Sequence, residues 1–319
     1  MKRFLTLFGI ILAALLVLLG IAGNYMCSYA LLPEEHGDDI EGDRAKTESR
    51  YPGVMAWYDS LRTHSLIRDT TLTGEGGYKL HGFFTAAQHP EQAEGTAVVV
   101  HGYTDNHVCF LNLVRMYRDS LNYNVMVPDL HYHGLSEGRA VQMGWLDRLD
   151  IKRFGEMAHD IWGQDFMVVH GVSMGAAATM MLSGDELPAY YKAFVEDCGY
   201  TSVWDQFAHN LKDAFGLPAF PILNFASLAC KIRYGWGFKE ASSVARLAHC
   251  TRPMLFIHGD ADDYVVFENL QKNYDAKVNG YKEMWVAEGS GHAMAYRDHP
   301  AEYVARVRAF LKTVQKLQR

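Results

Sequence analysis

The stretch "VVHGVSMGAAATMML" (168–182) joins an apolar run to an Ala- and Met-rich segment through one serine between two glycines. The apolar run is typical of a buried strand, and the segment after the serine is typical of a helix start. Glycines two residues before and after Ser173 let a strand and a helix approach closely in a sharp turn. The motif alone leaves Ser173 either as a nucleophile or as a small turn residue, so partners elsewhere must decide.

Short apolar runs bounded by Gly, Pro or Asp recur on both sides of this turn. They lie at 96–102, 124–129, 165–171, 193–199, 253–259 and 283–288, with helical patterns at 109–121, 267–278 and 300–317. Strands that alternate with helices predict a mainly parallel sheet with helices on both faces. The segments 67–73 and 79–86 flank a Gly-rich turn and predict an antiparallel hairpin. We therefore expect one α/β domain over 67–319.

A nucleophilic serine needs a base, and the base candidates follow the last strand of the predicted sheet. Ligands bind parallel sheets at the carboxyl ends of the strands, where such loops gather. His292 lies there in "EGSGHAMAY", and two glycines give its loop freedom to bring the ring inward. His299 is a weaker candidate, because Pro300 begins the next helix directly after it. We expect His292 to be the base.

The base needs a carboxylate to orient it, and one loop offers three. The loop "IHGDADDYVV" (257–266) follows a predicted strand and contains Asp260, Asp262 and Asp263, while Asp197 ends the preceding strand. Aspartates also form turns, and position at a strand end does not separate Asp262 from Asp263.

Several further motifs give the chain a resemblance to the α/β-hydrolase superfamily over residues 67–317. "HGYTDN" (101–106) is similar to its oxyanion loop, "PDLHYHGLSEG" (128–138) to its Asp-x-x-Gly-His-Gly-x-Ser segment, and "SGHAM" (290–294) to its histidine loop. Tyr132 stands where that family usually has glycine, and Val266 where it usually has proline. Within the superfamily the chain most resembles bacterial hydrolases of the serine aminopeptidase and monoacylglycerol-lipase-like group.

This resemblance implies an α/β-hydrolase fold with a mostly parallel eight-stranded sheet and a Ser-His-Asp triad in the chain order Ser, Asp, His. It assigns the acid to Asp262, beside Ser173 as nucleophile and His292 as base. It also implies that the backbone N–H groups of Tyr103 and Met174 hold the oxyanion. Neither a cofactor nor a metal is expected.

About fifty residues separate two of the predicted strands, which is too many for a structureless loop. We interpret residues 203–245 as a helical lid over the strand ends, although an ordinary buried connection is the alternative. The segment is rich in aromatic and aliphatic residues and suggests a pocket for an acyl or aryl group. The predicted pocket residues are Phe207, Phe215, Phe220 and Phe225.

The N-terminus carries an uncharged apolar run, residues 4–23, after Lys2 and Arg3. Its length is sufficient to cross a bilayer, and the basic flank predicts a cytoplasmic N-terminus with the remainder outside. Residues 1–30 are therefore either a signal anchor or a cleaved signal peptide, with cleavage sites after Ala30 or near Gly23. Residues 31–66 would form a helical or linker arm. The five cysteines have no metal-ligand spacing, and free thiols are preferred to a single disulfide.

The sequence thus predicts an exported serine hydrolase that cleaves a small or medium carboxylic ester, either membrane-anchored or secreted. A peptidase or thioesterase could use the same triad, and Glu240 or Asp213 could then bind a substrate amine. A non-catalytic binding protein on the same fold is a further alternative. The net charge of −7 and the absence of a basic stripe argue against a nucleic-acid partner.

Overall fold

An eight-stranded sheet forms the centre of the protein in the computed structural model, which describes residues 1–318. The strand order is β1-β2-β4-β3-β5-β6-β7-β8, and β3 to β8 are parallel, whereas β2 is antiparallel to both β1 and β4. The strands are β1 (Ile67–Thr73), β2 (Lys79–Thr85), β3 (Thr96–Val100), β4 (Asn124–Pro128), β5 (Met167–Val172), β6 (Tyr191–Asp197), β7 (Met254–Gly259) and β8 (Lys282–Ala287). This arrangement confirms the predicted fold class.

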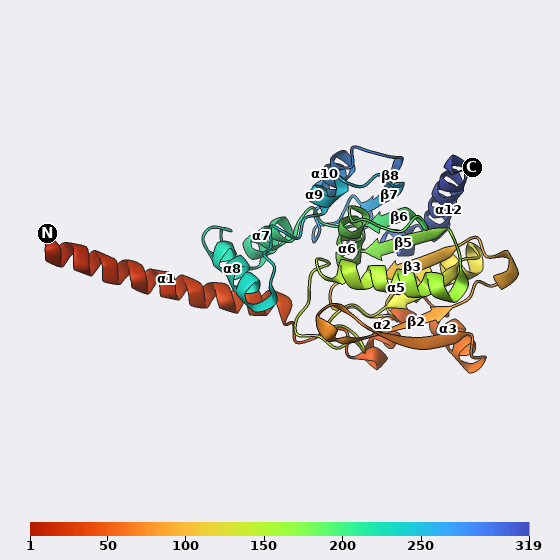
Figure 1. The fold of residues 1–319 in the computed structure, drawn as a ribbon, viewed down its shortest axis with the longest axis horizontal. Helices are drawn as coiled ribbons and strands as arrows, with labels where there is room; N and C mark the ends of the chain where they lie inside the picture. Colours follow the sequence, from red (N-terminus) through yellow and green to blue (C-terminus); the bar gives the residue numbers. More distant parts are fainter. Residues whose placement is uncertain (319) are drawn as a thin grey trace.

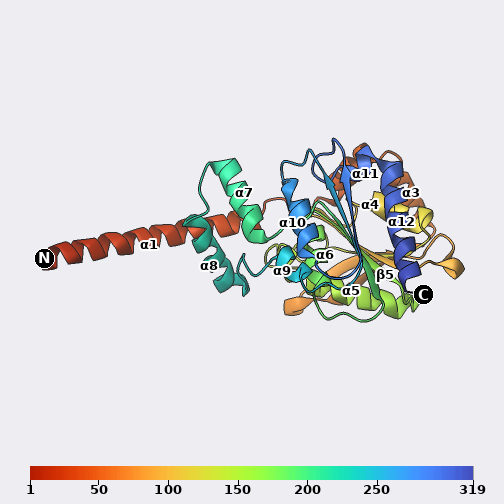
Figure 2. The ribbon, with the colours of Figure 1, turned by 90° about the horizontal axis from the view of Figure 1, so that it is seen from above.

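Helices cover both faces of the sheet, and each face has its own apolar core (Figure 2). One core packs α5 (Asp147–Trp162), α6 (Met174–Ser183), α9 (Ser243–Leu247) and α10 (Glu268–Ala276) against the sheet. The other packs α3 (Val54–Thr63), α4 (Leu111–Arg115), the π-helical turn η3 (Met116–Ser120), α11 (Ala295–Asp298) and α12 (Pro300–Leu317). The strands between the two layers are fully buried, which explains their uninterrupted apolar runs.

Two details of the helical layer differ from the sequence-based expectation. The helix expected over 109–121 begins at Leu111 and changes to π-helical geometry at Met116. The helix α5 had not been identified at all, because its sequence "DRLDIKRFGEMAHDIW" interrupts the apolar spacing with several charges. Two of those charged residues, Asp147 and Asp150, are buried.

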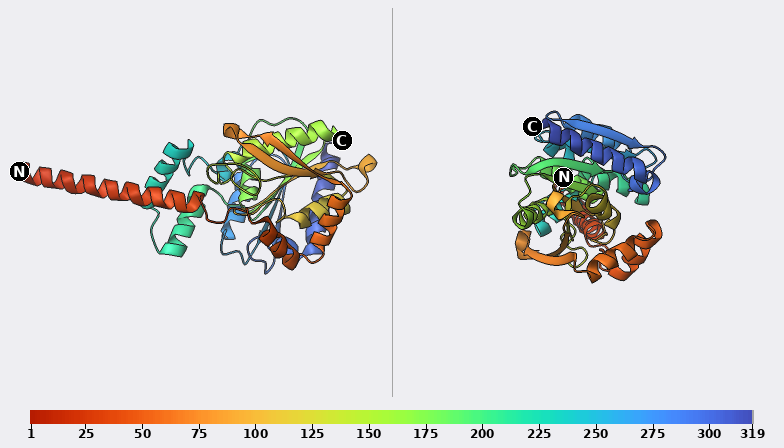
Figure 3. Two further views of the ribbon diagram at one scale, coloured as in Figure 1. Left: turned by 90° about the horizontal axis from the view of Figure 1, so that it is seen from below. Right: turned by 90° about the vertical axis from the view of Figure 1, so that its right-hand side faces the viewer.

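The chain before the sheet forms three helices. The long helix α1 (Lys2–Leu31) extends far from the domain, whereas α2 (Ile40–Arg50) and α3 lie against the body of the molecule (Figure 1). Between β6 and β7, the predicted lid contains α7 (Val203–Phe215) and α8 (Ile222–Tyr234). These two helices lie on either side of α1, near the end that joins the domain, in Figure 2 and in the left panel of Figure 3. The lid and α1 therefore form one projecting end of the molecule.

Candidate active site

Ser173 lies in the turn between β5 and α6 with a backbone φ of 56° and ψ of −116°. Such a conformation is rare for a residue with a side chain and costs about 1–3 kcal/mol, so the surrounding structure must impose it. A Cβ on Gly171 would lie 2.0 Å from the carbonyl oxygen of Gly175, and one on Gly175 would lie 2.3 Å from that of Val100. The two glycines are therefore required by the close packing of strand and helix around the serine.

The loops after β7 and β8 bring a carboxylate and an imidazole to this serine. Nε2 of His292 lies 2.8 Å from Oγ of Ser173. Nδ1 of the same ring lies 2.8 Å from Oδ2 of Asp262. The three side chains therefore form one continuous hydrogen-bonded chain across three strand ends, with the serine and the histidine at its accessible end.

The carboxylate of Asp262 is buried and fully hydrogen-bonded. Its Oδ1 accepts the backbone N–H groups of Tyr264 and Val265, each at 3.0 Å, and its Oδ2 also lies 3.2 Å from Nε2 of His258. Burial alone would raise the pKa of Asp262, but the hydrogen bonds from His258 and His292 outweigh it and lower the pKa to about 2. Asp262 is thus held as an anion wherever the protein is folded near neutral pH.

The other candidates for base and acid lie elsewhere. Asp263 is exposed beside the cavity above the serine, and its backbone carbonyl accepts from His209. Asp260 is exposed and accepts the backbone N–H of Gly289. Asp197 is buried and accepts from the hydroxyl of Tyr303. His299 bonds to the backbone carbonyl of Glu288.

The loop after β3 approaches Ser173 from the opposite side. A Cβ on Gly102 would lie 3.5 Å from Cβ of Ser173, so this loop passes next to the serine. Within the described residues, the backbone N–H of Tyr103 has no hydrogen-bond partner. Met174 is the first residue of α6, where an amide has no partner inside the helix. Two backbone donors are therefore free on either side of the serine.

Buried side chains hold the loop after β3 in place. The carboxylate of Asp129, at the end of β4, accepts the backbone N–H of His107 at 2.7 Å, and it also bonds to Nδ1 of His107 and of His81. Burial would raise the pKa of Asp129, but its hydrogen bonds with the two histidines hold it well below its usual range. Two groups of side chains place potential metal-ligand atoms within 4.8 Å of one another. One group is His81, His107 and Asp129, and the other is Cys198, Asp262 and His292. Hydrogen bonds within the protein already account for the Asp129 cluster.

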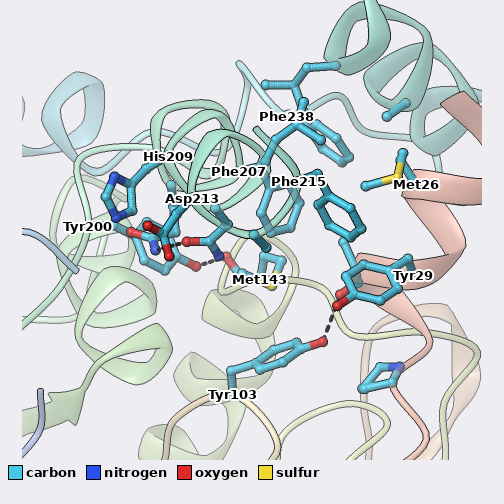
Figure 4. Close-up of a pocket in the computed structure, with 18 of the residues that line it drawn as sticks. Met26, Tyr29, Tyr103, Met143, Tyr200, Phe207, His209, Asp213, Phe215 and Phe238 are labelled. Carbon is cyan, nitrogen blue, oxygen red and sulfur yellow. Dashed lines mark hydrogen bonds between the residues drawn. The ribbon is translucent and has the colours of Figure 1, made fainter. Parts of the chain in front are cut away.

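A cavity of about 840 Å³ opens above the serine and is mostly apolar. Its lining includes Ser173 and Met174. Side chains of α7 and α1, among them Phe207 and Tyr29, form the opposite part of the lining (Figure 4). Of the four predicted pocket phenylalanines, the structure places Phe207 and Phe215 in the lining. Phe220 lies in the exposed turn between α7 and α8, and Phe225 packs against α1 at Gly23, so neither lines the cavity.

The contribution of α1 to this cavity had not been predicted. Tyr25, Met26 and Tyr29 line it from the C-terminal half of the helix. Figure 4 shows Met26 and Tyr29 on this wall. The hydroxyl of Tyr103 also donates a 3.0 Å hydrogen bond to the carbonyl of Ala30. The only sequence signal was the change from an uncharged run without tyrosine to the tyrosine-containing "NYMCSYAL" (24–31), which does not indicate a partner.

Comparisons with known proteins address the family and the fold. The model of the prolyl oligopeptidase family, Peptidase_S9, matches residues 156–318, just over half of the chain. The uncharacterized protein YqkD of Bacillus subtilis is 26% identical, with 98% of this chain and 97% of YqkD covered. The solved structure of the Pyrococcus furiosus esterase Pf2001 matches with a TM-score of 0.63 and 22% identity, covering 79% of this chain and 95% of that one. The Pyrococcus horikoshii acylaminoacyl peptidase matches with a TM-score of 0.58 and 15% identity, covering 81% and 43%.

At these low identities the solved structures establish the fold, whereas the family match extends over half of the chain and includes β5, α6, the lid and the last helix. Both the esterase and the peptidase carry the same sheet and helical layers. The chain belongs to the prolyl oligopeptidase family of the α/β-hydrolase superfamily, and it is a serine hydrolase of the esterase and peptidase kind.

Proposed function

We propose that the protein hydrolyses a carboxylic ester with a small to medium acyl group through a covalent acyl-enzyme. Oγ of Ser173 attacks the ester carbonyl while Nε2 of His292 takes its proton, and Asp262 holds the ring in the required tautomer. Collapse of the tetrahedral intermediate breaks the bond to the alkoxy oxygen, which leaves with the proton from His292. Water then attacks the acyl-enzyme by the same route and releases the acid and Ser173.

The developing oxyanion would be held by the backbone N–H groups of Tyr103 and Met174. These groups lie on either side of Ser173, and main-chain donors on rigid elements stabilise a transition state without reorganisation. The Asp129 cluster supports this role because it fixes the loop that carries Tyr103. Loss of one such donor typically raises the barrier by about 2.7–4 kcal/mol.

The observation that carries the proposal is the hydrogen-bonded chain of Ser173, His292 and Asp262 at the floor of an apolar cavity. Phe207, Phe215 and Phe238 contribute its aromatic wall (Figure 4). An apolar lining of this kind favours an acyl chain over a charged group, because burial of a charge without a partner is costly.

A peptidase is the second candidate, because three acidic residues line the cavity, Glu34, Asp213 and Asp263. Asp213 lines the cavity and could bind the amine of an aminoacyl substrate (Figure 4). Glu240, the other anion considered for this role, lies outside the lining and pairs with Lys231 at 2.7 Å. The family match and the fold of the acylaminoacyl peptidase are compatible with this alternative.

A substrate panel separates the two candidates. The full chain in detergent is assayed with p-nitrophenyl esters of graded acyl length beside aminoacyl-p-nitroanilides, with Ser173→Ala as the inactive control. We expect ester hydrolysis that Asp213→Asn leaves unchanged. Hydrolysis of the anilides alone, with a raised KM in Asp213→Asn, would contradict the ester preference and identify the peptidase.

For the cellular location, the apolar α1 is compatible with either a signal peptide or an anchor. We propose an anchor, with Lys2 and Arg3 in the cytoplasm and the catalytic domain on the other side of the membrane. The packing of its C-terminal half against the domain supports retention, since cleavage would expose buried apolar surface.

A further inference from the structure

We propose that α1, as a membrane anchor, forms one wall of the active-site cavity, and that the acyl substrate enters the cavity directly from the bilayer surface. The substrate class is then an amphiphilic ester with one acyl chain dissolved in the leaflet on the side of the catalytic domain. This inference rests on the proposed ester hydrolysis at Ser173 and extends it to the source and the route of the substrate.

The helix α1 consists of two parts with different surroundings. Its first part, up to residue 22, is apolar and has no fully buried residue. Because an α-helix rises about 1.5 Å per residue, these residues span about 30 Å, the thickness of a hydrocarbon core. Burial begins at Gly23 and continues at Cys27 and Leu31. The boundary between membrane and domain therefore falls close to Gly23.

The second part of α1 is built into the domain. A Cβ on Gly23 would lie 2.4 Å from Cβ of Phe225, so α1 and α8 touch at the backbone there. Arg233 of α8 donates a 2.7 Å hydrogen bond to Oγ of Ser28. The backbone N–H of Val141 donates to the carbonyl of Leu31 at 2.9 Å. Cleavage after Ala30 would remove the contacts of Gly23 and Ser28 with α8 and one side of the cavity.

One hydrogen bond connects the anchor to the catalytic machinery. The hydroxyl of Tyr103, whose backbone N–H is assigned to the oxyanion, donates to the carbonyl of Ala30 at 3.0 Å (Figure 4). The last turn of α1 thus contacts the loop that would stabilise the transition state, and the cavity wall from Tyr25 to Glu34 leads from the anchor to Ser173.

The turn before α8 is a second apolar segment close to the exposed part of α1. Gly23 meets Phe225 and Ser28 meets Arg233, so α1 and α8 run in the same direction, and the turn before α8 lies toward the exposed part of α1 (Figure 2). This turn, "GLPAFP" (216–221), has no charge, and it exposes Leu217 and 77% of Phe220. We infer that it dips into the interface beside α1.

The most exposed aromatic side chains of the cavity wall belong to α1. Tyr25 and Tyr29 line the cavity and remain more than half exposed, and the ring of Tyr29 packs edge-on against Phe215, 5.5 Å away. Tyrosines just past an apolar span are typical of the headgroup level of a membrane. An acyl chain could therefore pass from the leaflet along these rings to Ser173 without crossing water.

The test compares a membrane-dissolved ester with a water-soluble ester in one preparation. The full chain is reconstituted into vesicles of ether-linked phosphatidylcholine, which contains no ester for the enzyme to cleave. The two substrates are 4-methylumbelliferyl decanoate, a medium-chain ester that partitions into the vesicles, and p-nitrophenyl acetate in solution. The variant Leu217→Ser/Phe220→Ser changes only side chains outside the cavity lining. Val278→Ser is the matched control, because Val278 is 71% exposed and precedes the start of β8. It therefore lies at the amino ends of the parallel strands, whereas Ser173 lies at their carboxyl ends.

We expect the double variant to lose about tenfold or more in vesicle-substrate hydrolysis, since each lost apolar contact weakens docking of the lid. Its hydrolysis of the soluble ester should stay within about twofold of wild type, as should both activities of the control. Equal effects on both substrates, or none, would overturn the inference while leaving the esterase intact. Failure of the wild type on both esters would instead overturn the proposed function and this inference with it.

The mass of the mature protein gives an independent check. The chain purified from membranes should retain α1, so that its intact mass includes residues 2–30. A mature N-terminus after Gly23 or Ala30 would contradict an anchor that forms the cavity wall.

Discussion

At the residue scale, the site depends on which carboxylate reaches the histidine. Asp262 and Asp263 are neighbours, yet only Asp262 turns inward, because its Oδ1 accepts two backbone N–H groups of its own loop. That choice could not be made from the sequence alone, since both aspartates suit a turn after β7. The family-like motif favoured Asp262, and the 2.8 Å contact with His292 supports the same assignment.

We therefore predict opposite outcomes for two neighbouring substitutions. Asp262→Asn should lower kcat by about 10³–10⁴-fold, because the amide can stabilise the wrong tautomer of His292 and cannot stabilise its cation. Asp263→Asn should leave kcat within about twofold, since its side chain is exposed. Steady-state kinetics on a soluble ester distinguish them, and a loss confined to Asp263→Asn would show that the acid is misassigned.

Glu196 provides a residue-scale prediction about stability. It is fully buried beside the site, and burial raises its pKa to about 8, whereas an unfolded glutamate titrates near 4.3. Between these values the folded state binds more protons than the unfolded state, so stability falls as the pH rises, by up to about 1.4 kcal/mol per unit. Asp197, with a pKa raised by burial to about 6, contributes in the same direction.

The substitution Glu196→Gln should flatten this decline between pH 5 and 8, because the neutral amide has no proton to lose. Guanidinium unfolding midpoints in one detergent measure the effect, and the exposed Glu268→Gln should behave as the wild type. If the variant and the wild type lose stability in parallel over this range, the assignment of Glu196 as a buried neutral acid is wrong.

At the element scale, the sequence was sufficient for elements whose pattern is set by burial on both sides. The strands β3, β4 and β7 follow their apolar runs closely, because only a central strand buries every side chain. The lid helices are different. The helix α8 carries apolar residues around much of its circumference, so its sequence could not tell that Phe225 faces α1 and not the cavity. Such a phase is set by the tertiary partner.

The contact between α1 and α8 predicts different effects of the same substitution at two glycines of one helix. Gly23→Leu should destabilise the lid by about 1–3 kcal/mol, because a Cβ there meets the backbone of Phe225. Gly20→Leu should be neutral, since nothing lies within 4 Å of a Cβ at that position. Rates of limited proteolysis within residues 216–221 of the full chain report the difference. Equal rates in the two variants would mean that α1 does not support the lid.

At the scale of the whole molecule, the carboxyl ends of the parallel strands, the helices α7 and α8 and the base of α1 meet at one end (Figure 1). The parallel sheet brings Ser173, Asp262 and His292 together from three strand ends, and this part follows from the topology that the sequence predicts. The wall contributed by α1 could not be predicted, because an apolar N-terminal segment contains no information on what its last turns contact. The candidate site therefore combines a common hydrolase core with a cavity wall that α1 contributes.

The proposed mechanism depends first of all on Ser173 as the nucleophile. Reaction of the full chain with a fluorophosphonate, followed by mapping of the modified peptide, tests this assignment. We expect a single adduct on Ser173 that disappears in Ser173→Ala and forms far more slowly in His292→Ala. Undiminished labelling of Ser173→Ala, or an adduct mapped to another serine, would contradict it.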